Sequence, residues 1–464
     1  MQKSVLAEIV RSLSRKEIRE VNKWLQSPAH NQREDVVRLF DFLTKHLGDS
    51  GQDEAVEKNR AWKAVFSGEA YDDARMRQVM YFLLKAIEEY LVFSDSMEDQ
   101  AKYLNALTKT YRVRKLDKAY RQAHRQGRDF LDKQPLRNGY YLMHRFHLEE
   151  EEYYYQMGIT QNAPVNLQET SDALEKWFAA EKLRISNSML AHHNVYQKAN
   201  YDQGLLDQIL NYSTDHKLIV EPAVRVYYFA YMAITHPSEE QYFDQFEDLI
   251  HDECEKLFSA SEVLNLYKAA LNFCTAKVNQ GNLDYCRRAL NFYRRGLETE
   301  ILIENNHITR YTFGNAVAFA IKIGEYGWAE QFIEQFQHYL EEKERQSIVN
   351  FNQSRVYYEK GDYNKAQTLL THFEYDDMLL NIIAKTMLLK IYYEQGELDA
   401  FESLLESMRI YLQRKEALDP TRKTAYKNMI SLMKKLLNLN PYSKAQTERL
   451  RTAIEAAHPL MEKE

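Results

Sequence analysis

The 464-residue sequence predicts an all-α fold, an α-solenoid of helical hairpins preceded by an N-terminal helical module. Three observations predict it. Glycine (14 residues) and proline (8 residues) are too sparse for the many turns of a strand-rich protein. Apolar residues, 45% of the chain, recur at helical spacing along its length. Towards the C-terminus a helix–turn–helix pattern repeats with a glycine at each turn.

Residues 1–95 are predicted to form the compact N-terminal module. Ser14 and Glu17 have the spacing of a capping box, and the helix LSRKEIREVNKWL that follows is stopped by Pro28. Two further helices, EDVVRLFDFLTKHL and RMRQVMYFLLKAIEEYLVF, flank a polar loop at 48–59. The second of them is the most apolar, so we expect it at the centre of the module.

Residues 96–255 are predicted to form irregularly spaced helical hairpins. Three segments have helical periodicity: AYRQAHRQGRDFL, YYLMHRFHLEEEEYYYQM and DALEKWFAAEKLRISNSML. GITQNAPVN (158–166) is a loop, and VYYFAYMAITHPSEEQYFDQFEDLI divides into two helices at THPS.

Residues 256–415 contain a countable repeat. Its turn glycines are spaced by 43, 37 and 35 residues, at Gly281, Gly324, Gly361 and Gly396. A lone helical hairpin cannot bury both of its faces, so each unit must stack on its neighbours. Residues 416–464 supply two more helices, which we expect to cap the array.

These units resemble the tetratricopeptide repeat (TPR). In YYEKGDYNKAQTLL the positions of the TPR pattern are filled by Tyr357, Gly361, Tyr363, Ala366 and Leu370. The resemblance implies a right-handed superhelix in which the first helix of each hairpin lines a concave groove. It also implies that Tyr358 faces this groove while Tyr357 packs between the two helices of its repeat.

The pattern is not uniform along the array. GEYGWAEQFIEQF keeps it one unit earlier, whereas Phe401 and Cys286 replace the usual small residue in two other units. The whole chain is also similar to a group of bacterial proteins that combine an N-terminal helical module with C-terminal TPRs.

The repeat register identifies candidate groove residues. Nine residues before the turn glycines stand Asn272, Asn315 and Asn352, and then Met387. The resemblance implies that this position lines the concave face, where an amide can pair with both the N–H and the C=O of an extended peptide. The alternative is that these asparagines share a register by chance or hydrogen-bond within and between repeats.

Five further residues complete the predicted groove. Arg355 and Lys390 would add positive charge within reach of an acidic side chain or a carboxyl terminus. Phe351, Tyr358 and Tyr393 would form aromatic walls.

Charge is unevenly distributed along the chain. Residues 102–137 hold eleven Lys or Arg against three Asp, and residues 239–262 hold nine Asp or Glu against Lys256. The basic stretch could bind nucleic-acid phosphates. We favour the alternative that it is a solvated face, or a face that pairs with the acidic stretch of the same or a neighbouring molecule. The cluster from Arg287 to Arg295 is expected to be solvated. The net charge of −7 disfavours a general nucleic-acid binder.

Signals for catalysis, metals and membranes are weak. His144, His147 and Glu151 share a helical face, but their spacing lacks the pattern of a catalytic metal site, and no nucleotide-binding or hydrolase motif occurs. No segment has the roughly 20 apolar residues of a membrane helix. The N-terminus lacks a secretory pattern, so we expect a cytoplasmic protein without a membrane partner.

The three cysteines point to the same compartment. Cys254, Cys274 and Cys286 form no CxxC pair and leave an odd number, which favours a reducing environment. We expect them to be buried and inert.

The functional prediction is a non-enzymatic scaffold without a cofactor, whose groove binds a protein or an extended peptide. One alternative is a regulatory receptor in which a bound peptide changes what the N-terminal module contacts. Another is a nucleic-acid-associated protein that uses residues 102–137. The sequence leaves the oligomeric state open.

Overall fold

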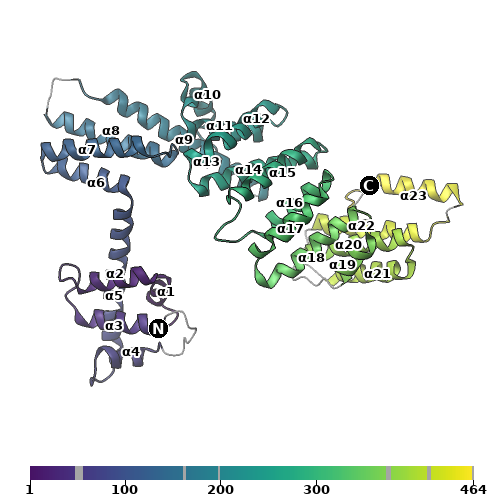
Figure 1. The fold of residues 1–464 in the computed structure, drawn as a ribbon, viewed down its shortest axis with the longest axis horizontal. Coiled ribbons are helices and arrows are strands. Elements are labelled where there is room, and N and C mark those ends of the chain that lie inside the picture. Colours follow the sequence, from purple (N-terminus) through teal and green to yellow (C-terminus); the bar gives the residue numbers. More distant parts are fainter. Residues whose placement is uncertain are drawn as a thin grey trace. The chain divides into compact units, whose positions relative to one another are not determined.

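The structure is a computed structural model that describes residues 1–47, 56–159, 164–196, 199–371, 378–414, 420–440 and 442–461. Over these ranges the all-α prediction is confirmed: helices form throughout, no strand occurs, and the only bridge is an isolated one between Glu304 and His307 (Figure 1). The predicted loop at 48–59 lies outside the described residues over 48–55, and its last two residues are helical instead. The predicted loop at 158–166 lies partly outside them, and its first two residues still belong to the preceding helix. The chain divides into two compact units, Met1–Glu181 and Lys182–Glu464.

The first unit is built from helices α1 (Val5–Ser12), α2 (Arg15–Gln26), α3 (Glu34–His46), α4 (Lys58–Val65), α5 (Asp73–Glu98), α6 (Gln100–Val113), α7 (Asp117–Lys133) and α8 (Gly139–Ile159). The predicted capping box is confirmed at the start of α2. The Glu17 backbone N–H donates to Ser14 Oγ, and the Ser14 N–H donates to Glu17 Oε2 at 2.7 Å. Helix α2 ends at Gln26, ahead of Pro28.

Helix α5 is central to the N-terminal part of this unit, as its apolar sequence predicts. It packs against α1, α2 and α3. Val79, Leu83 and Ile87 of α5 lie with Leu39 and Phe40 of α3 in one fully buried cluster. Burying each such side chain stabilises the fold by about 1.5–3 kcal/mol.

The second unit begins within α9 (Leu167–Val195), which crosses from the first. It continues through α10 (Leu206–Asp215), the short turn η2 (Leu218–Val220), α11 (Pro222–Thr235), α12 (Glu240–Leu249), η3 (Ile250–Cys254), α13 (Glu255–Leu257), α14 (Ala260–Asn279), α15 (Asp284–Glu298), α16 (Arg310–Lys322), α17 (Tyr326–Phe336), η4 (Gln337–Tyr339), α18 (Glu342–Glu359), α19 (Tyr363–Thr371), α20 (Met378–Gln395), α21 (Leu398–Arg414), α22 (Pro420–Leu437) and α23 (Lys444–Ala456).

Consecutive helices of the second unit pair as hairpins. Helix α14 packs against α15, α16 against α17, α18 against α19, and α20 against α21 (Figure 1). First helices also meet across hairpins, since α11 contacts α14 and α16 contacts α18. Helix α22 covers the end of the series, where Tyr426, Met429 and Ile430 pack against Phe401 and Leu405 of α21. The expected covering of this apolar end is therefore present.

The four turn glycines have one backbone conformation in common. Gly281, Gly324, Gly361 and Gly396 all have positive φ, between 72° and 94°. After α18, the Gly361 N–H donates to the Tyr358 carbonyl and the Asp362 N–H to the Tyr357 carbonyl, each at 2.9 Å. These two bonds make a Schellman cap, which needs a left-handed residue that glycine adopts without a Cβ penalty.

Gly361→Ala is expected to destabilise the protein by about 1–2 kcal/mol, because the left-handed conformation is strained for an L-residue. No atom lies within 4 Å of the added Cβ, so the cost comes from the backbone alone. Gly327 within α17 also has open space for a Cβ, and Gly327→Ala is expected to stabilise by about 0.5–1 kcal/mol. Urea unfolding that moved both midpoints in the same direction would contradict this account.

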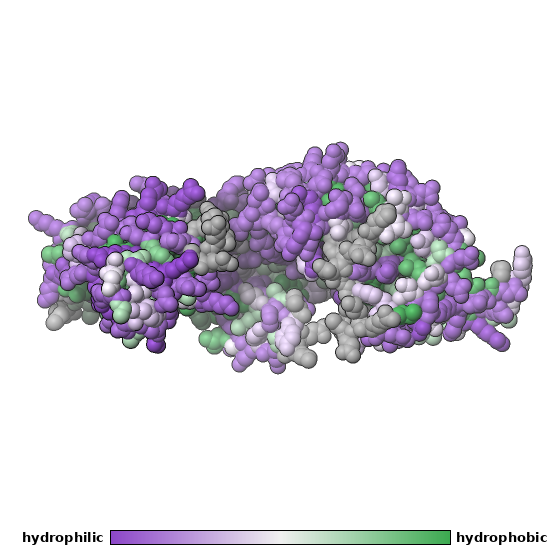
Figure 2. Space-filling model, turned by 90° about the horizontal axis from the view of Figure 1, so that it is seen from below, coloured by the Kyte–Doolittle hydropathy of each residue, from purple (hydrophilic) through white to green (hydrophobic). Residues whose placement is uncertain are grey.

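The face of the molecule seen in Figure 2 is mostly hydrophilic, with smaller apolar patches between the polar side chains. Across the described ranges, no helix combines the length and apolarity that crossing a bilayer requires.

Candidate functional site

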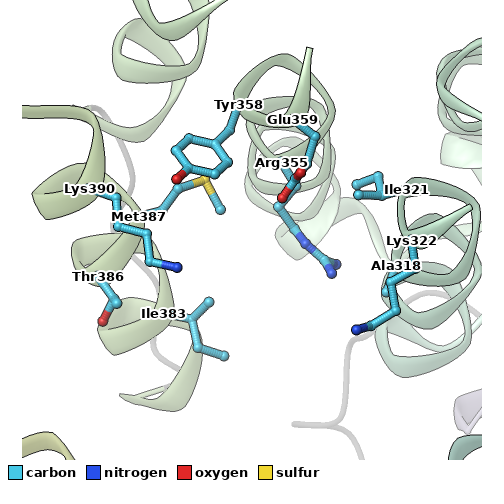
Figure 3. A pocket seen from close by; sticks show the side chains of 10 residues that line it. All are labelled: Ala318, Ile321, Lys322, Arg355, Tyr358, Glu359, Ile383, Thr386, Met387 and Lys390. Atoms are coloured by element: carbon cyan, nitrogen blue, oxygen red, sulfur yellow. The ribbon is translucent and has the colours of Figure 1, made fainter. Parts of the chain in front are cut away.

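A cavity of about 300 Å³ lies between α16, α18 and α20, the first helices of three successive hairpins (Figure 3). We call it the cationic cavity. Its lining consists of Ala318, Ile321, Lys322, Arg355, Tyr358, Glu359, Ile383, Thr386, Met387 and Lys390.

Helical spacing explains why these side chains share the cavity. Residues three and four apart lie on one face of a helix. The α18 lining follows this rule with Arg355, Tyr358 and Glu359. Helices α16 and α20 each contribute a face in the same way, starting from Ala318 and Ile383. The lining is therefore set by the repeat register rather than by loops.

Arg355 is the cation held most firmly in the cavity. Its Nη1 donates to the Gly314 carbonyl at 3.1 Å and to Asn352 Oδ1 at 3.4 Å. Among the described residues it has no carboxylate partner, and its Nε and Nη2 make no hydrogen bond. Burial lowers the pKa of Arg355 to about 10, a shift that Glu359 opposes, so the guanidinium remains charged at neutral pH.

Two lysines add to this charge from the neighbouring helices. Lys322 of α16 is exposed and makes no ion pair or hydrogen bond within the described part of the chain. Lys390 of α20 is half-buried, and Figure 3 shows its ammonium directed into the space that Arg355 also faces. Glu359 is the one acid of the lining. The site therefore carries an excess of positive charge suited to an anionic group.

The rest of the lining is apolar or already hydrogen-bonded. Tyr358 is half-buried, and its ring lies 5.6 Å from that of Tyr363. Thr386 Oγ1 donates to the Ile382 carbonyl at 2.9 Å, which leaves the hydroxyl oxygen able to accept only. Together with Met387, these side chains form a wall along which the apolar part of a bound segment can lie.

The three predicted groove asparagines occupy three different environments. Asn272 is exposed and lines a separate cavity. Asn315 is exposed on α16, and its side chain hydrogen-bonds the buried Tyr293 hydroxyl. Asn352 is only 1% exposed, and its Nδ2 donates to the Ile348 carbonyl at 2.8 Å. Asn352 thus hydrogen-bonds within its own repeat, which is the alternative to ligand binding given above. The three asparagines therefore do not form one continuous row along a groove.

The two remaining predicted groove residues do not line the cationic cavity. Phe351 is 5% exposed and belongs to the core shared by α18, α19 and α20. It lies under the Arg355 guanidinium, whose carbon is 5.7 Å from the ring centre. Tyr393 is 46% exposed, with its ring 6.0 Å from that of Phe401. Of the three aromatic residues predicted to line the groove, only Tyr358 lines the cationic cavity.

Sequence reasoning did not name Lys322 and Thr386, which line the cationic cavity, among the candidate groove residues. The repeat register could have identified Lys322. Ala318 stands six residues before its turn glycine, as Arg355 and Lys390 do before theirs. Lys322 follows Ala318 by four residues and therefore shares its helix face. Met387 occupies the asparagine position of its repeat.

A second cavity, of about 460 Å³, lies between α9, α11 and α14, and we call it the amide-lined cavity. Four carboxamide side chains line it: Asn187, Asn194, Asn272 and Gln280. Asn187 Nδ2 donates to the Leu183 and Tyr227 carbonyls, whereas its buried Oδ1 has no donor within the described residues. Apolar side chains such as Ile234 and Phe273 also line it, and Lys277 Nζ donates a hydrogen bond to the Pro237 carbonyl. This cavity suits a neutral, hydrogen-bonding segment.

The basic stretch at 102–137 meets acids of its own unit. Arg112 pairs with Glu151 at 2.6 Å, and Arg128 lies 4.0 Å from Glu149. The partners of these two arginines are thus acids of α8. These pairs use part of the charge that a nucleic acid would need.

The expected solvation of the second arginine cluster holds for Arg287, whose side chain is 68% exposed, and is wrong for Arg288, whose side chain is 24% exposed. Arg288 pairs with Asp244 at 2.8 Å and with Glu247, and Arg295 pairs with Glu255 at 2.8 Å. These two arginines are only partly exposed because the acids of α12 and α13 lie within reach of α15. They pair with three of the nine acids in residues 239–262: Asp244, Glu247 and Glu255.

The possible metal residues are engaged otherwise. His144 is buried, its Nδ1 lies 2.8 Å from Asn105 Nδ2, and burial lowers its pKa. Arg112 holds Glu151. Over the described ranges, no group of three His, Cys, Asp or Glu side chains is placed to share a metal ion.

The three cysteines are free thiols inside the second unit. Burial raises the pKa of Cys274 to about 12 and raises the pKa values of Cys254 and Cys286 as well. A thiol with a raised pKa is a poor nucleophile, which agrees with the expectation that these residues are inert.

Comparison of the chain with protein-family models, with curated proteins and with solved structures finds no match. The geometry of the two cavities is therefore the feature that bears on the function of this protein.

Proposed function

We propose that this protein is a non-enzymatic scaffold that binds an extended, acidic segment of a partner protein. The binding surface is the concave face of a right-handed, TPR-like superhelix formed by the hairpins from α14 to α21. The four Schellman-capped glycine turns and the contacts between first helices support this arrangement. The buried thiols support a reducing, cytoplasmic location.

The observation that carries the proposal is the half-buried Arg355 guanidinium, which has no ion pair among the described residues and whose Nε and Nη2 make no hydrogen bond there. Glu359 is the one acid of the lining, and it attracts this guanidinium without pairing with it. An incoming carboxylate would supply the missing partner through Nε and Nη2, with Lys322 and Lys390 beside it. Hydrogen bonds between the Arg355 guanidinium and a ligand carboxylate would be stronger than hydrogen bonds between neutral groups, and two of them can form side by side.

The amide-lined cavity extends the proposal to a neutral stretch of the same kind of ligand. The unpaired Oδ1 of Asn187 needs a donor, which a backbone N–H provides. Asn194 and Asn272 offer both donors and acceptors beside it. In this proposal the acidic side chains of the ligand bind in the cationic cavity, and an uncharged stretch of its backbone binds in the amide-lined cavity.

A random decapeptide library passed over the immobilised full chain tests the proposal, with bound peptides sequenced by mass spectrometry. The parent protein is expected to enrich acidic peptides, and Lys322→Glu/Lys390→Glu to lose that enrichment. Lys343→Glu/Lys427→Glu is the matched control, because it makes the same charge change at exposed lysines outside the cavity. Equal enrichment by the parent and the cavity variant, or none by the parent, would reject the proposal.

A further inference from the structure

The amide-lined cavity contains one hydrogen-bond acceptor whose orientation is fixed. Asn187 Nδ2 donates to the carbonyl oxygens of Leu183 and Tyr227, at 2.9 and 2.8 Å. A carbonyl oxygen can only accept, so these two bonds use both amide protons of Asn187 and leave its Oδ1 with no bond. This Oδ1 is buried and has no donor among the described residues. Because an unpaired buried acceptor is costly, the cavity favours a ligand group that brings an N–H or O–H donor.

The other walls of this cavity favour a large apolar body beside that donor. Six of the eleven lining residues are apolar: Ala191, Ile234, Pro237, Ala269, Phe273 and Ala276. The volume of about 460 Å³ lies within the range of roughly 300–1,000 Å³ that is usual for ligand pockets. Aliphatic side chains have no donor, and the small hydroxyl and carboxamide side chains have little apolar surface. Tryptophan and tyrosine combine a large apolar ring with one N–H or O–H group.

Lys277 gives a second, independent reason for an aromatic ring. Its Nζ donates to the Pro237 carbonyl. The same Nζ lies 5.6 Å from the centre of the Phe273 ring and 5.4 Å from that of the Tyr285 ring. The described lining contains no acidic residue, so an aromatic ring that enters the cavity gains a cation–π interaction with this ammonium. An ionised acidic side chain brings only acceptors and cannot pair with Asn187 Oδ1.

We infer that the amide-lined cavity binds the side chain of a tryptophan or tyrosine, whose N–H or O–H donates to Asn187 Oδ1. The inference rests on the proposed function, which places an uncharged stretch of the ligand in this cavity. It names the side chain that this stretch carries, and it assigns the donor for Oδ1 to that side chain rather than to the backbone. The acidic part of the ligand stays in the cationic cavity.

Ligand-observed NMR titrations with the full chain test this inference. Four probes are compared: N-acetyl-tryptophan-N-methylamide, the same compound with benzothiophene in place of indole, N-acetylglycine-N-methylamide and free indole. Benzothiophene keeps the shape of indole and replaces its N–H by sulfur, which cannot donate. The tryptophan probe is expected to bind at least about fivefold more tightly than each of the other three, because it alone combines the ring, the donor and the peptide groups.

A substitution in the lining locates the binding site. Ala276 is an exposed residue of α14, and Ala276→Phe adds a ring to the cavity wall. This variant is expected to weaken binding of the tryptophan probe at least about fivefold, since the added ring occupies space that the probe needs. Ala106→Phe is the matched control at an exposed position of α6 outside the cavity, and it is expected to leave binding unchanged.

Each contrary result overturns a stated part of the inference. Absence of binding by the tryptophan probe rejects it as a whole, and unchanged binding by Ala276→Phe rejects this cavity. Equal binding of the benzothiophene probe rejects the hydrogen bond to Asn187. Equal binding of N-acetylglycine-N-methylamide rejects the aromatic side chain in favour of backbone alone, and equal binding of indole rejects a peptide in favour of a free aromatic compound. The proposed function is rejected separately, by the absence of acidic-peptide enrichment.

Discussion

Replacing Arg355 with methionine is expected to weaken the binding of an acidic decapeptide at least 30-fold. Removing one member of a buried, hydrogen-bonded charge pair costs about 2–5 kcal/mol of binding, and about 1.4 kcal/mol is a factor of ten. Arg355 is the cation whose unpaired donors point into the cavity, so its loss removes the central contact. Fluorescence polarisation with a labelled peptide from the library measures the effect.

The same substitution is expected to change the free energy of unfolding by less than about 1 kcal/mol. Methionine removes the cost of holding a cation without a counter-ion, and this gain offsets the loss of the donor to Gly314 and Asn352. If the substitution weakens peptide binding but leaves the free energy of unfolding nearly unchanged, Arg355 serves ligand binding; a structural arginine would lose stability when replaced.

Arg345→Met is the matched control on the same helix. Arg345, like Arg355, donates to backbone carbonyl oxygens, in its case those of His338 and Leu340, and it lies outside the cavity. Its replacement is expected to leave peptide affinity unchanged. A large loss of stability in Arg355→Met with unchanged affinity would instead assign Arg355 to packing.

Phe243→Ala is expected to cause the largest loss of stability, about 3–5 kcal/mol. The Phe243 ring is fully buried, stacks on Phe273 at 4.3 Å and lies 5.7 Å from the Tyr285 ring. The Arg288 guanidinium lies 4.4 Å above it. Alanine therefore leaves a cavity where α12 meets α14 and α15, and it removes the surface on which Arg288 rests.

Urea unfolding gives the magnitude, and hydrogen exchange gives the location. Exchange is expected to rise most in α12, α14 and α15, because units of a helical array depend mainly on their neighbours. Tyr311→Ala, at a site 65% exposed, is the control and should change stability by less than about 0.5 kcal/mol. A loss below about 1 kcal/mol for Phe243→Ala would contradict the central place given to this ring.

Local structure followed from short stretches of sequence because its causes are local. The Ser14–Glu17 capping box involves neighbours three residues apart, and the left-handed caps at Gly361 and Gly396 are set by the turn residue itself. The central place of α5 followed from its sequence, the most apolar of the N-terminal module. The charge that Arg355 and Lys390 bring to one cavity also followed from the register of the repeats.

Burial and partner choice did not follow in this way. The same register position is exposed at Asn272 and Asn315, buried at Asn352 and cavity-lining at Met387. Which of these faces solvent depends on how closely the next first helix approaches, and Arg355 and Gly314 close over Asn352 where α16 meets α18. The pairing of the Arg287–Arg295 cluster with acids of α12 and α13 likewise depends on helix packing.

The sequence by itself determined the all-α class, the helix ends and the four glycine turns, because hydrogen bonds and steric limits within a few residues decide them. Only the tertiary structure decided which polar groups found partners and which faced a cavity. Those outcomes depend on distances between helices about 40 residues apart. There the guanidinium of Arg355 donates to the Gly314 carbonyl and forms no ion pair with any described carboxylate. The donors that Arg355 leaves free are what support the proposed anion-binding function.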